Sequence, residues 1–180
     1  MRQKTAAMAS RLSILTLLFM ALTTPGWAVE AGDPAPAWIG RDVKGEAVSF
    51  PEVTGGKPAV LVFWATWCPY CKAFMPYLDA IQQDYAADGV QIIAINALER
   101  GRGDPIAYLE SLGSPLIGIL YGDHIATAYA VEFIPGLMVV DGAGRVSYRR
   151  APTERPAGQS LAKFWDAEVR EALDLIVKVD

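Results

Sequence analysis

The chain has 180 residues, with 16 Lys and Arg against 20 Asp and Glu, so its formal net charge is −4 at pH 7. This acidic balance argues against a nucleic-acid-binding protein and gives no basic face for anionic lipid. Its two cysteines are too few for the disulfide scaffold of a small secreted fold, so the core must come from burial of apolar side chains.

Residues 1–28 have the pattern of an export signal. Three basic residues in the first eleven positions precede an apolar run over residues 12–22, and the small residues Gly26 and Ala28 lead to a cleavage site. The run is shorter than the roughly 20 residues of a transmembrane helix; an uncleaved N-terminal anchor is the alternative. We expect one exported domain over residues 29–180, periplasmic if the source is a Gram-negative bacterium.

Strands and helices are predicted to alternate in the first half of this domain. A short edge strand is predicted over residues 47–50, and a buried central strand over residues 59–64, where apolar, β-branched and aromatic side chains are continuous. The apolar stripe over about residues 68–87 has the 3.6-residue period of a helix, which Pro76 should kink. A second buried strand is predicted over residues 90–95.

The second half continues this order. Asp104 and Pro105 pair an N-cap residue with proline at the first helical position, which predicts a helix to about residue 112. The remaining predicted elements are a strand over 115–121, a helical turn over 126–130, a hairpin of strands over 137–140 and 145–149, and an amphipathic helix over 161–177. The order of elements predicts the α/β fold class, a sheet with helices on both faces.

The two cysteines, Cys68 and Cys71, are separated by two residues at the start of the first predicted helix. A thiol attacks as its thiolate, and the unpaired amides and dipole of a helix N-terminus stabilise that anion. We therefore predict that Cys68, exposed at the helix start, is the attacking nucleophile. Cys71, one turn later and more buried, is predicted to be the resolving thiol.

Other roles for the cysteine pair fit the sequence less well. A zinc site needs two further ligands, and His124 is the only histidine. A permanent disulfide over so small a loop would add little stability by loop closure. A buried strand that leads into a helix beginning at the pair favours thiol–disulfide exchange, for which we expect no metal and no cofactor.

Residues 63–72, Phe-Trp-Ala-Thr-Trp-Cys-Pro-Tyr-Cys-Lys, resemble the active-site segment of the thioredoxin superfamily. The lead-in over residues 32–36 and the segment Tyr-Ala-Val-Glu-Phe-Ile-Pro over residues 129–135 are similar to its exported TlpA/ResA-like branch. The resemblance implies a thioredoxin-like fold with a central mixed sheet and an N-terminal β extension. It also implies a thiol:disulfide oxidoreductase that acts on protein thiols and disulfides and takes electrons from a membrane donor.

The resemblance further implies a substrate groove beside the cysteines. In such proteins a cis-proline, here Pro135, faces the Cys-x-x-Cys motif, and the residue before it, here Ile134, offers backbone hydrogen bonds to a bound chain. Trp67, Pro69 and Tyr70 complete the groove that we expect.

The sequence departs from the family at positions whose acids help to deprotonate the resolving thiol. Val62 stands where thioredoxins carry aspartate, and Phe74 where many TlpA/ResA-like proteins carry glutamate. Lys57 and Glu132 are the remaining candidates for the proton acceptor, which the sequence leaves unassigned. After the expected cis-proline, Gly136 replaces the threonine that is common in the family.

Two questions of function stay open at this level. The resemblance favours reduction of protein disulfides, including a role in cytochrome c maturation, because the oxidising branch carries a helical insertion for which this chain has no room. The alternative is a copper chaperone or assembly factor on the same fold. Such proteins usually separate their cysteines by three residues and add a histidine near the site, whereas His124, predicted to lie in a surface loop, precedes Pro135 by eleven positions.

Overall fold

The structure, a computed structural model, describes residues 29–101, 103–154 and 156–177. The predicted export signal, residues 1–28, lies outside the described residues. The strands are β1 (Trp38–Arg41), β2 (Ala47–Phe50), β3 (Ala59–Trp64), β4 (Gln91–Asn96), β5 (Ile117–Ile119), β6 (Gly136–Val140) and β7 (Val146–Arg149). The helices are α1 (Pro69–Asp84), α2 (Pro105–Leu112), α3 (Asp123–Ala128) and α4 (Leu161–Val177).

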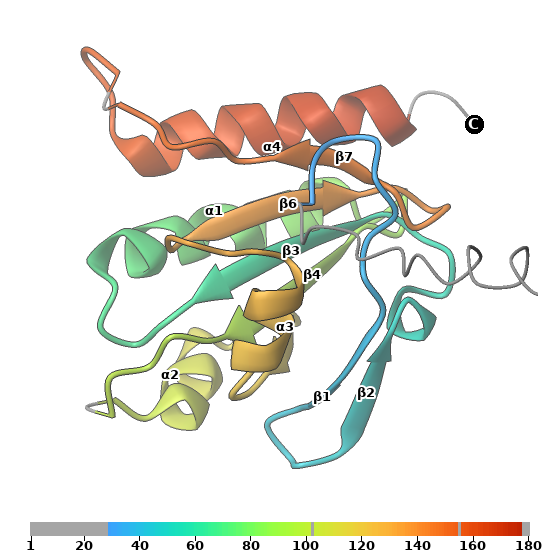
Figure 1. The fold of residues 1–180 in the computed structure, drawn as a ribbon. Coiled ribbons are helices and arrows are strands. Elements are labelled where there is room, and N and C mark those ends of the chain that lie inside the picture. Colours follow the sequence, from blue (N-terminus) through green and yellow to red (C-terminus); the bar gives the residue numbers. More distant parts are fainter. Residues whose placement is uncertain (1–28, 102, 155, 178–180) are drawn as a thin grey trace, which may run out of the picture.

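A five-stranded sheet of order β5-β4-β3-β6-β7 forms the centre of the fold (Figure 1). β3 pairs in parallel with β4 and antiparallel with β6, β5 is parallel to β4, and β7 is antiparallel to β6. The sheet is therefore mixed. β1 and β2 form a separate antiparallel hairpin, which is the N-terminal β extension. The predicted thioredoxin-like fold class is confirmed.

Two apolar cores lie on opposite faces of this sheet, because successive side chains of a strand point to opposite faces. Val60, Val62 and Trp64 of β3 pack into a cluster with buried residues of α1, α2 and α4. Leu61 and Phe63 pack on the other face with α3 and the β1–β2 hairpin. All six residues of β3 are buried, which accounts for its continuous apolar sequence.

Most element bounds agree with the sequence predictions, and the differences have local causes. β5 is shorter than predicted, because only Ile117–Ile119 pair with β4. The predicted turn after it is helix α3, which begins at Asp123 and therefore includes His124, expected in a loop. β1 was not predicted; it pairs with the short strand β2 and, through Arg41, with Leu120 after β5, and its own sequence marks neither partner. Pro76 lies inside α1, and the kink stays a prediction.

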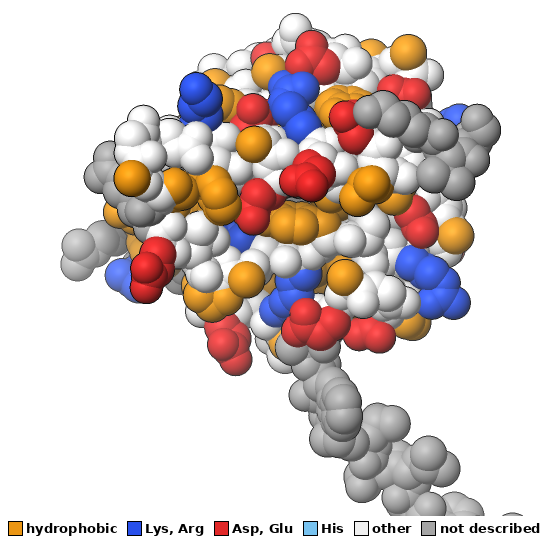
Figure 2. Space-filling model, turned by 90° about the horizontal axis from the view of Figure 1, so that it is seen from above, with side chains coloured by type: hydrophobic (Ala, Val, Ile, Leu, Met, Phe, Trp, Pro, Cys, Tyr) orange, Lys and Arg blue, Asp and Glu red, His pale blue; other side chains and the backbone are white. Residues whose placement is uncertain are grey.

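The surface agrees with the acidic composition on the face that Figure 2 shows. There acidic and basic side chains alternate, with small apolar areas between them. This face offers no broad basic surface of the kind that binds nucleic acid.

We expect the β1–β2 hairpin to contribute to global stability through its buried face. Trp38 is 6% exposed and stacks on Phe50 with 5.6 Å between the ring centroids. Replacing Trp38 by Ala leaves a cavity in this core and should lower the free energy of unfolding by about 3–5 kcal/mol, measured by urea denaturation. The matched control is Ile39→Ala on the same strand, where the side chain is 68% exposed and the change should stay within about 0.5 kcal/mol. Equal losses in both variants would contradict this role.

Candidate active site

The cysteine pair lies where the central strand leads into the first helix. β3 ends at Trp64, and α1 begins at Pro69 with Cys68 as its N-cap residue in an extended conformation (φ −88°, ψ 106°). Pro69 occupies the first helical turn, where the amide that proline lacks would have no helical partner. The pair therefore stands at the carboxyl end of the central strand, an edge at which open α/β sheets bind their ligands.

Cys68 and Cys71 form a disulfide, with 5.3 Å between their Cα atoms. The backbone amide of Cys71 donates a hydrogen bond to Cys68 Sγ at 3.1 Å. An amide of the helix N-terminus is thus aimed at the sulfur that we predict to be the nucleophile. This geometry stabilises negative charge on Cys68 once the bond is reduced.

Both cysteines are buried, although we predicted that Cys68 would be exposed. The exposed fractions are 2% for Cys68 and 1% for Cys71. That prediction is wrong for the disulfide form, because Cys68 Sγ turns toward Cys71 and lies 3.9 Å from the carbonyl oxygen of Ile134. Position in the helix, rather than burial, distinguishes the two sulfurs.

The residues predicted to line the groove surround this disulfide. The Ile134–Pro135 peptide bond is cis, as the resemblance implied, and the Ile134 carbonyl faces Cys68. Pro135 is buried, whereas Tyr70, on the first turn of α1, is 57% exposed. Trp67 is half-buried and Pro69 is exposed. Their role in docking a substrate stays a prediction.

A carboxylate that the sequence analysis missed fixes the turn before Cys68. Glu99 accepts hydrogen bonds from the Thr66 amide (2.6 Å), the Thr66 hydroxyl (2.7 Å) and the side-chain amide of Asn96 (2.6 Å). Thr66 and Asn96 are both buried. The available signal was Asn96, a polar residue directly after the apolar run of residues 92–95, followed three residues later by Glu99.

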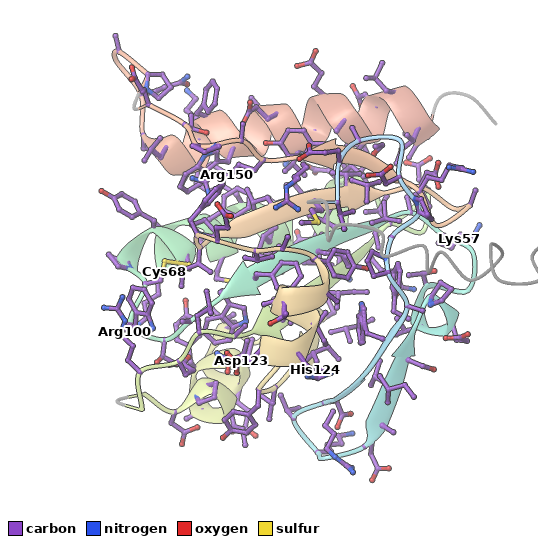
Figure 3. All side chains as sticks on the ribbon, viewed as in Figure 1. Lys57, Cys68, Arg100, Asp123, His124 and Arg150 are labelled. Carbon is purple, nitrogen blue, oxygen red and sulfur yellow. A yellow bond between two sulfur atoms is a disulfide. The ribbon has the colours of Figure 1, made fainter. Side chains whose placement is uncertain are left out.

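The same loop also packs on Trp67, the residue directly before Cys68. The Trp67 indole donates a hydrogen bond to the Leu98 carbonyl at 2.8 Å, and the Arg100 guanidinium carbon lies 3.7 Å from the centre of a Trp67 ring. Figure 3 shows Arg100 on one side of Cys68 and Arg150 on the other. The loop after β4 thus fixes the side chain that borders Cys68.

The two predicted proton acceptors, Lys57 and Glu132, lie in different parts of the structure. Lys57 precedes β3 and Cys68 follows it, so about 20 Å of strand separates them, at opposite ends of the molecule in Figure 3. Lys57 instead lines an open cavity of about 860 Å³ beside Asp88 and Leu175. The prediction that Lys57 is the proton acceptor for Cys71 is therefore wrong. Glu132 is exposed on the loop before Pro135 and stays a candidate.

The histidine that a copper site would use lies away from the cysteines. His124 Nε2 is 2.9 Å from the Ile39 carbonyl oxygen, on the β1–β2 hairpin side of the molecule (Figure 3). Within the described residues, no cluster of three or more His, Cys, Asp or Glu side chains has the arrangement of a metal site. No contact in this region favours the copper-chaperone alternative.

Comparison with known proteins places this geometry in a family. Residues 30–163 match the family model described as Redoxin. The chain belongs to the Redoxin family. It is 31% identical over 142 residues to the thiol:disulfide interchange protein DsbE of Yersinia pestis, a match that covers 77% of this chain and 70% of that protein. It is 30% identical over 158 residues to the thiol-disulfide oxidoreductase ResA of Geobacillus thermodenitrificans, covering 80% and 87%.

A solved structure supports the same assignment of the fold. The crystal structure of a thiol:disulfide interchange protein of the thioredoxin family from Chlorobium tepidum superposes with a TM-score of 0.62 at 21% identity, covering 84% of this chain and 99% of that one. The predicted membership of the TlpA/ResA-like branch of the thioredoxin superfamily is confirmed. The prediction of an enzyme of dithiol–disulfide exchange is confirmed at the level of this family.

The Glu99 carboxylate is expected to stabilise the active-site turn. Glu99→Gln replaces one of two acceptor oxygens by an amide donor that faces the Thr66 and Asn96 donors, so the free energy of unfolding should fall by about 1–3 kcal/mol. Glu110→Gln, an exposed change on α2, is the control and should stay within about 0.5 kcal/mol. Urea denaturation of both variants checks this, and a Glu99→Gln protein as stable as the control would show that the three hydrogen bonds contribute nothing net.

Proposed function

We propose that this chain is an exported thiol:disulfide oxidoreductase that reduces protein disulfides with Cys68 and Cys71. The observation that carries the proposal is the position of Cys68 Sγ. It accepts the Cys71 amide at the N-terminus of α1 and lies 3.9 Å from the Ile134 carbonyl across the site. The helix N-terminus stabilises this sulfur as a thiolate, whether it attacks or leaves. The Ile134 backbone beside it is available for pairing with an extended substrate chain.

In the reducing direction the exchange takes two steps. The Cys68 thiolate attacks one sulfur of a substrate disulfide, which forms a mixed disulfide and releases the other substrate sulfur as a thiolate. Cys71 then loses its proton and attacks Cys68 Sγ, which forms the Cys68–Cys71 bond and releases the second substrate thiolate. Two electrons pass to the substrate, whose thiolates take protons from solvent. The products are a substrate dithiol and the disulfide form of the site.

We assign substrate docking to the residues around the disulfide. The backbone of Ile134 and the cis-proline Pro135 would pair with an extended segment that contains the substrate cysteine. Trp67, Pro69 and the exposed ring of Tyr70 would contact its side chains on the other side. Backbone pairing gives affinity that does not depend on sequence, which suits an enzyme for several protein substrates.

We propose the compartment of the reaction from the sequence. The basic and apolar pattern of residues 1–28 supports export, with the periplasm as the compartment in a Gram-negative cell. The described part of the chain has no helix that could cross a membrane. After each turnover the Cys68–Cys71 disulfide must be reduced again, for which we propose a membrane dithiol donor. We propose cysteine pairs that await haem attachment in cytochrome c maturation as substrates.

The roles of the two cysteines are separable by trapping. Cys71→Ser should hold a mixed disulfide between Cys68 and a disulfide substrate such as insulin, because no resolving thiol remains. Cys68→Ser should trap nothing. Non-reducing electrophoresis followed by mass spectrometry measures the adducts. Equal trapping by the two variants, or trapping by Cys68→Ser alone, would reverse the assignment.

The direction of transfer is measured with one peptide in two redox states. A peptide with a Cys-x-x-Cys-His segment is supplied as its disulfide to the reduced protein, and as its dithiol to the oxidised protein. We expect the first reaction to proceed further at equal concentrations, as the thiol content at equilibrium will report. Greater conversion in the second reaction would make the protein an oxidant of such cysteine pairs.

A further inference from the structure

Arg150 is a buried charged residue behind the loop that faces Cys68. It follows β7, and its side chain is 9% exposed. Of the described residues, it is the only charged one that is buried. A guanidinium keeps its proton in proteins, so the structure holds a permanent positive charge inside the molecule.

The guanidinium of Arg150 holds the cis-proline loop directly. Its Nη1 donates a short hydrogen bond to the carbonyl oxygen of Pro135. The Arg150 backbone amide donates to the Leu137 carbonyl at 2.9 Å, which fixes the start of the side chain against β6. Since the Pro135 carbonyl is one peptide unit from the Ile134 carbonyl that faces Cys68, Arg150 sets the orientation of the backbone opposite the nucleophile.

Aromatic rings link the same guanidinium to both helices of the site. Its carbon lies 4.7 Å from the Phe133 ring centre and 4.3 Å from the Trp165 ring centre. Trp165, on α4, in turn meets the rings of Tyr70 and Phe74 edge-on, with centroids 6.5 and 6.0 Å apart. The stacked guanidinium therefore joins the cis-proline loop, α4 and the first turns of α1.

The positive charge of Arg150 is only partly balanced by its neighbours. Burial lowers the pKa of the Arg150 guanidinium, whereas Tyr148 and Glu168 raise it. The Glu168 carboxylate also accepts a hydrogen bond from the Tyr148 hydroxyl at 2.9 Å. Arg150 Nε is buried and has no hydrogen-bond partner among the described residues. A buried charge with an unused donor costs folding free energy, and such groups are concentrated at functional sites.

We propose that Arg150 is a positioning residue of the exchange site: it orients the Ile134–Pro135 backbone for substrate docking, and its charge favours the Cys68 thiolate of the reduced protein. The proposal rests on the proposed exchange function. The apolar residues Val62 and Phe74 place no carboxylate in the buried cluster that holds the cysteines, and Glu168 offsets the charge of Arg150 only in part. Arg150 thus makes the reduced form easier to reach and the protein a weaker reductant.

The test compares charge and shape at position 150. Arg150→Met removes the charge and the hydrogen bond, and Arg150→Lys keeps the charge but loses the planar guanidinium. The matched control is Arg145→Met at the other end of β7, where Arg145 is exposed and donates to the Gly32 carbonyl. The other charged or titratable side chains that border the site stay in every variant: Tyr70, Lys72, Glu99, Arg100, Glu132, Tyr148 and Glu168.

Three quantities are measured for each variant. The first is the equilibrium with dithiothreitol. In this reaction dithiothreitol gives two electrons and forms its ring disulfide, while the Cys68–Cys71 bond breaks. Of the two protons that dithiothreitol releases, Cys71 takes one. The second goes to solvent to the extent that Cys68 stays a thiolate. The second is the rate of alkylation of Cys68 by iodoacetamide at pH 6, in a Cys71→Ser background. The third is kcat and KM for reduction of a peptide disulfide.

For Arg150→Met we expect the dithiothreitol equilibrium to shift toward the oxidised protein and the alkylation rate to fall, each about three- to tenfold, together with a higher KM. Arg150→Lys should restore the first two quantities but not KM, and Arg145→Met should leave all three unchanged.

Values for Arg150→Met equal to those of Arg145→Met would overturn the proposal. If Arg150→Met does not fold, a parental KM in Arg150→Lys overturns the positioning role and a raised KM supports it. If the parent protein itself reduces no peptide disulfide, the proposed function fails, while the equilibrium and the alkylation rate still decide the role of the charge.

Discussion

The antiparallel pairing of β3 with β6 is the constraint on which the active site depends. Phe63 lies opposite Gly136, so the end of β3 and the start of β6 meet at one edge of the sheet. The chain that leaves β3 becomes the N-terminus of α1 with Cys68, and the chain that enters β6 is the Ile134–Pro135 segment. A change of this register by one residue would turn the side chains of β6 to the wrong face and move the segment away from Cys68.

This pairing also explains a departure from the family pattern. A Cβ atom on Gly136 would lie 3.0 Å from Val131 Cγ1 and 3.3 Å from Phe63 Cβ, which is closer than ordinary contact. A larger residue after the cis-proline would thus press on the loop and on the central strand. The glycine permits close packing of the 131–135 loop on β3 in this protein.

Two side chains of opposite charge support the two halves of the site. Glu99, from the loop after β4, fixes the turn before Cys68 through three hydrogen bonds. Arg150, from the end of β7, fixes the loop across from it through the Pro135 carbonyl. Glu99 accepts hydrogen bonds from donors, whereas Arg150 donates to a carbonyl oxygen. The turn before Cys68 and the loop that faces it are thereby held by two different charged side chains.

The sequence by itself determined the local features of this protein. The continuous apolar run of β3, the N-cap and proline at Asp104 and Pro105, and the amphipathic period of α4 depend on neighbours in the chain, so their bounds were predictable. The spacing of Cys68 and Cys71 at a helix start likewise predicted thiol–disulfide exchange. Tertiary structure alone decided the β1 strand, the burial of Cys68, and the contacts of Glu99 and Arg150. The Glu99–Thr66 and Arg150–Pro135 contacts join residues 33 and 15 positions apart in the sequence. The nearby Asn96 indicates a local partner for Glu99, but no local pattern indicates Thr66 or Pro135, which only the order of the strands brings near.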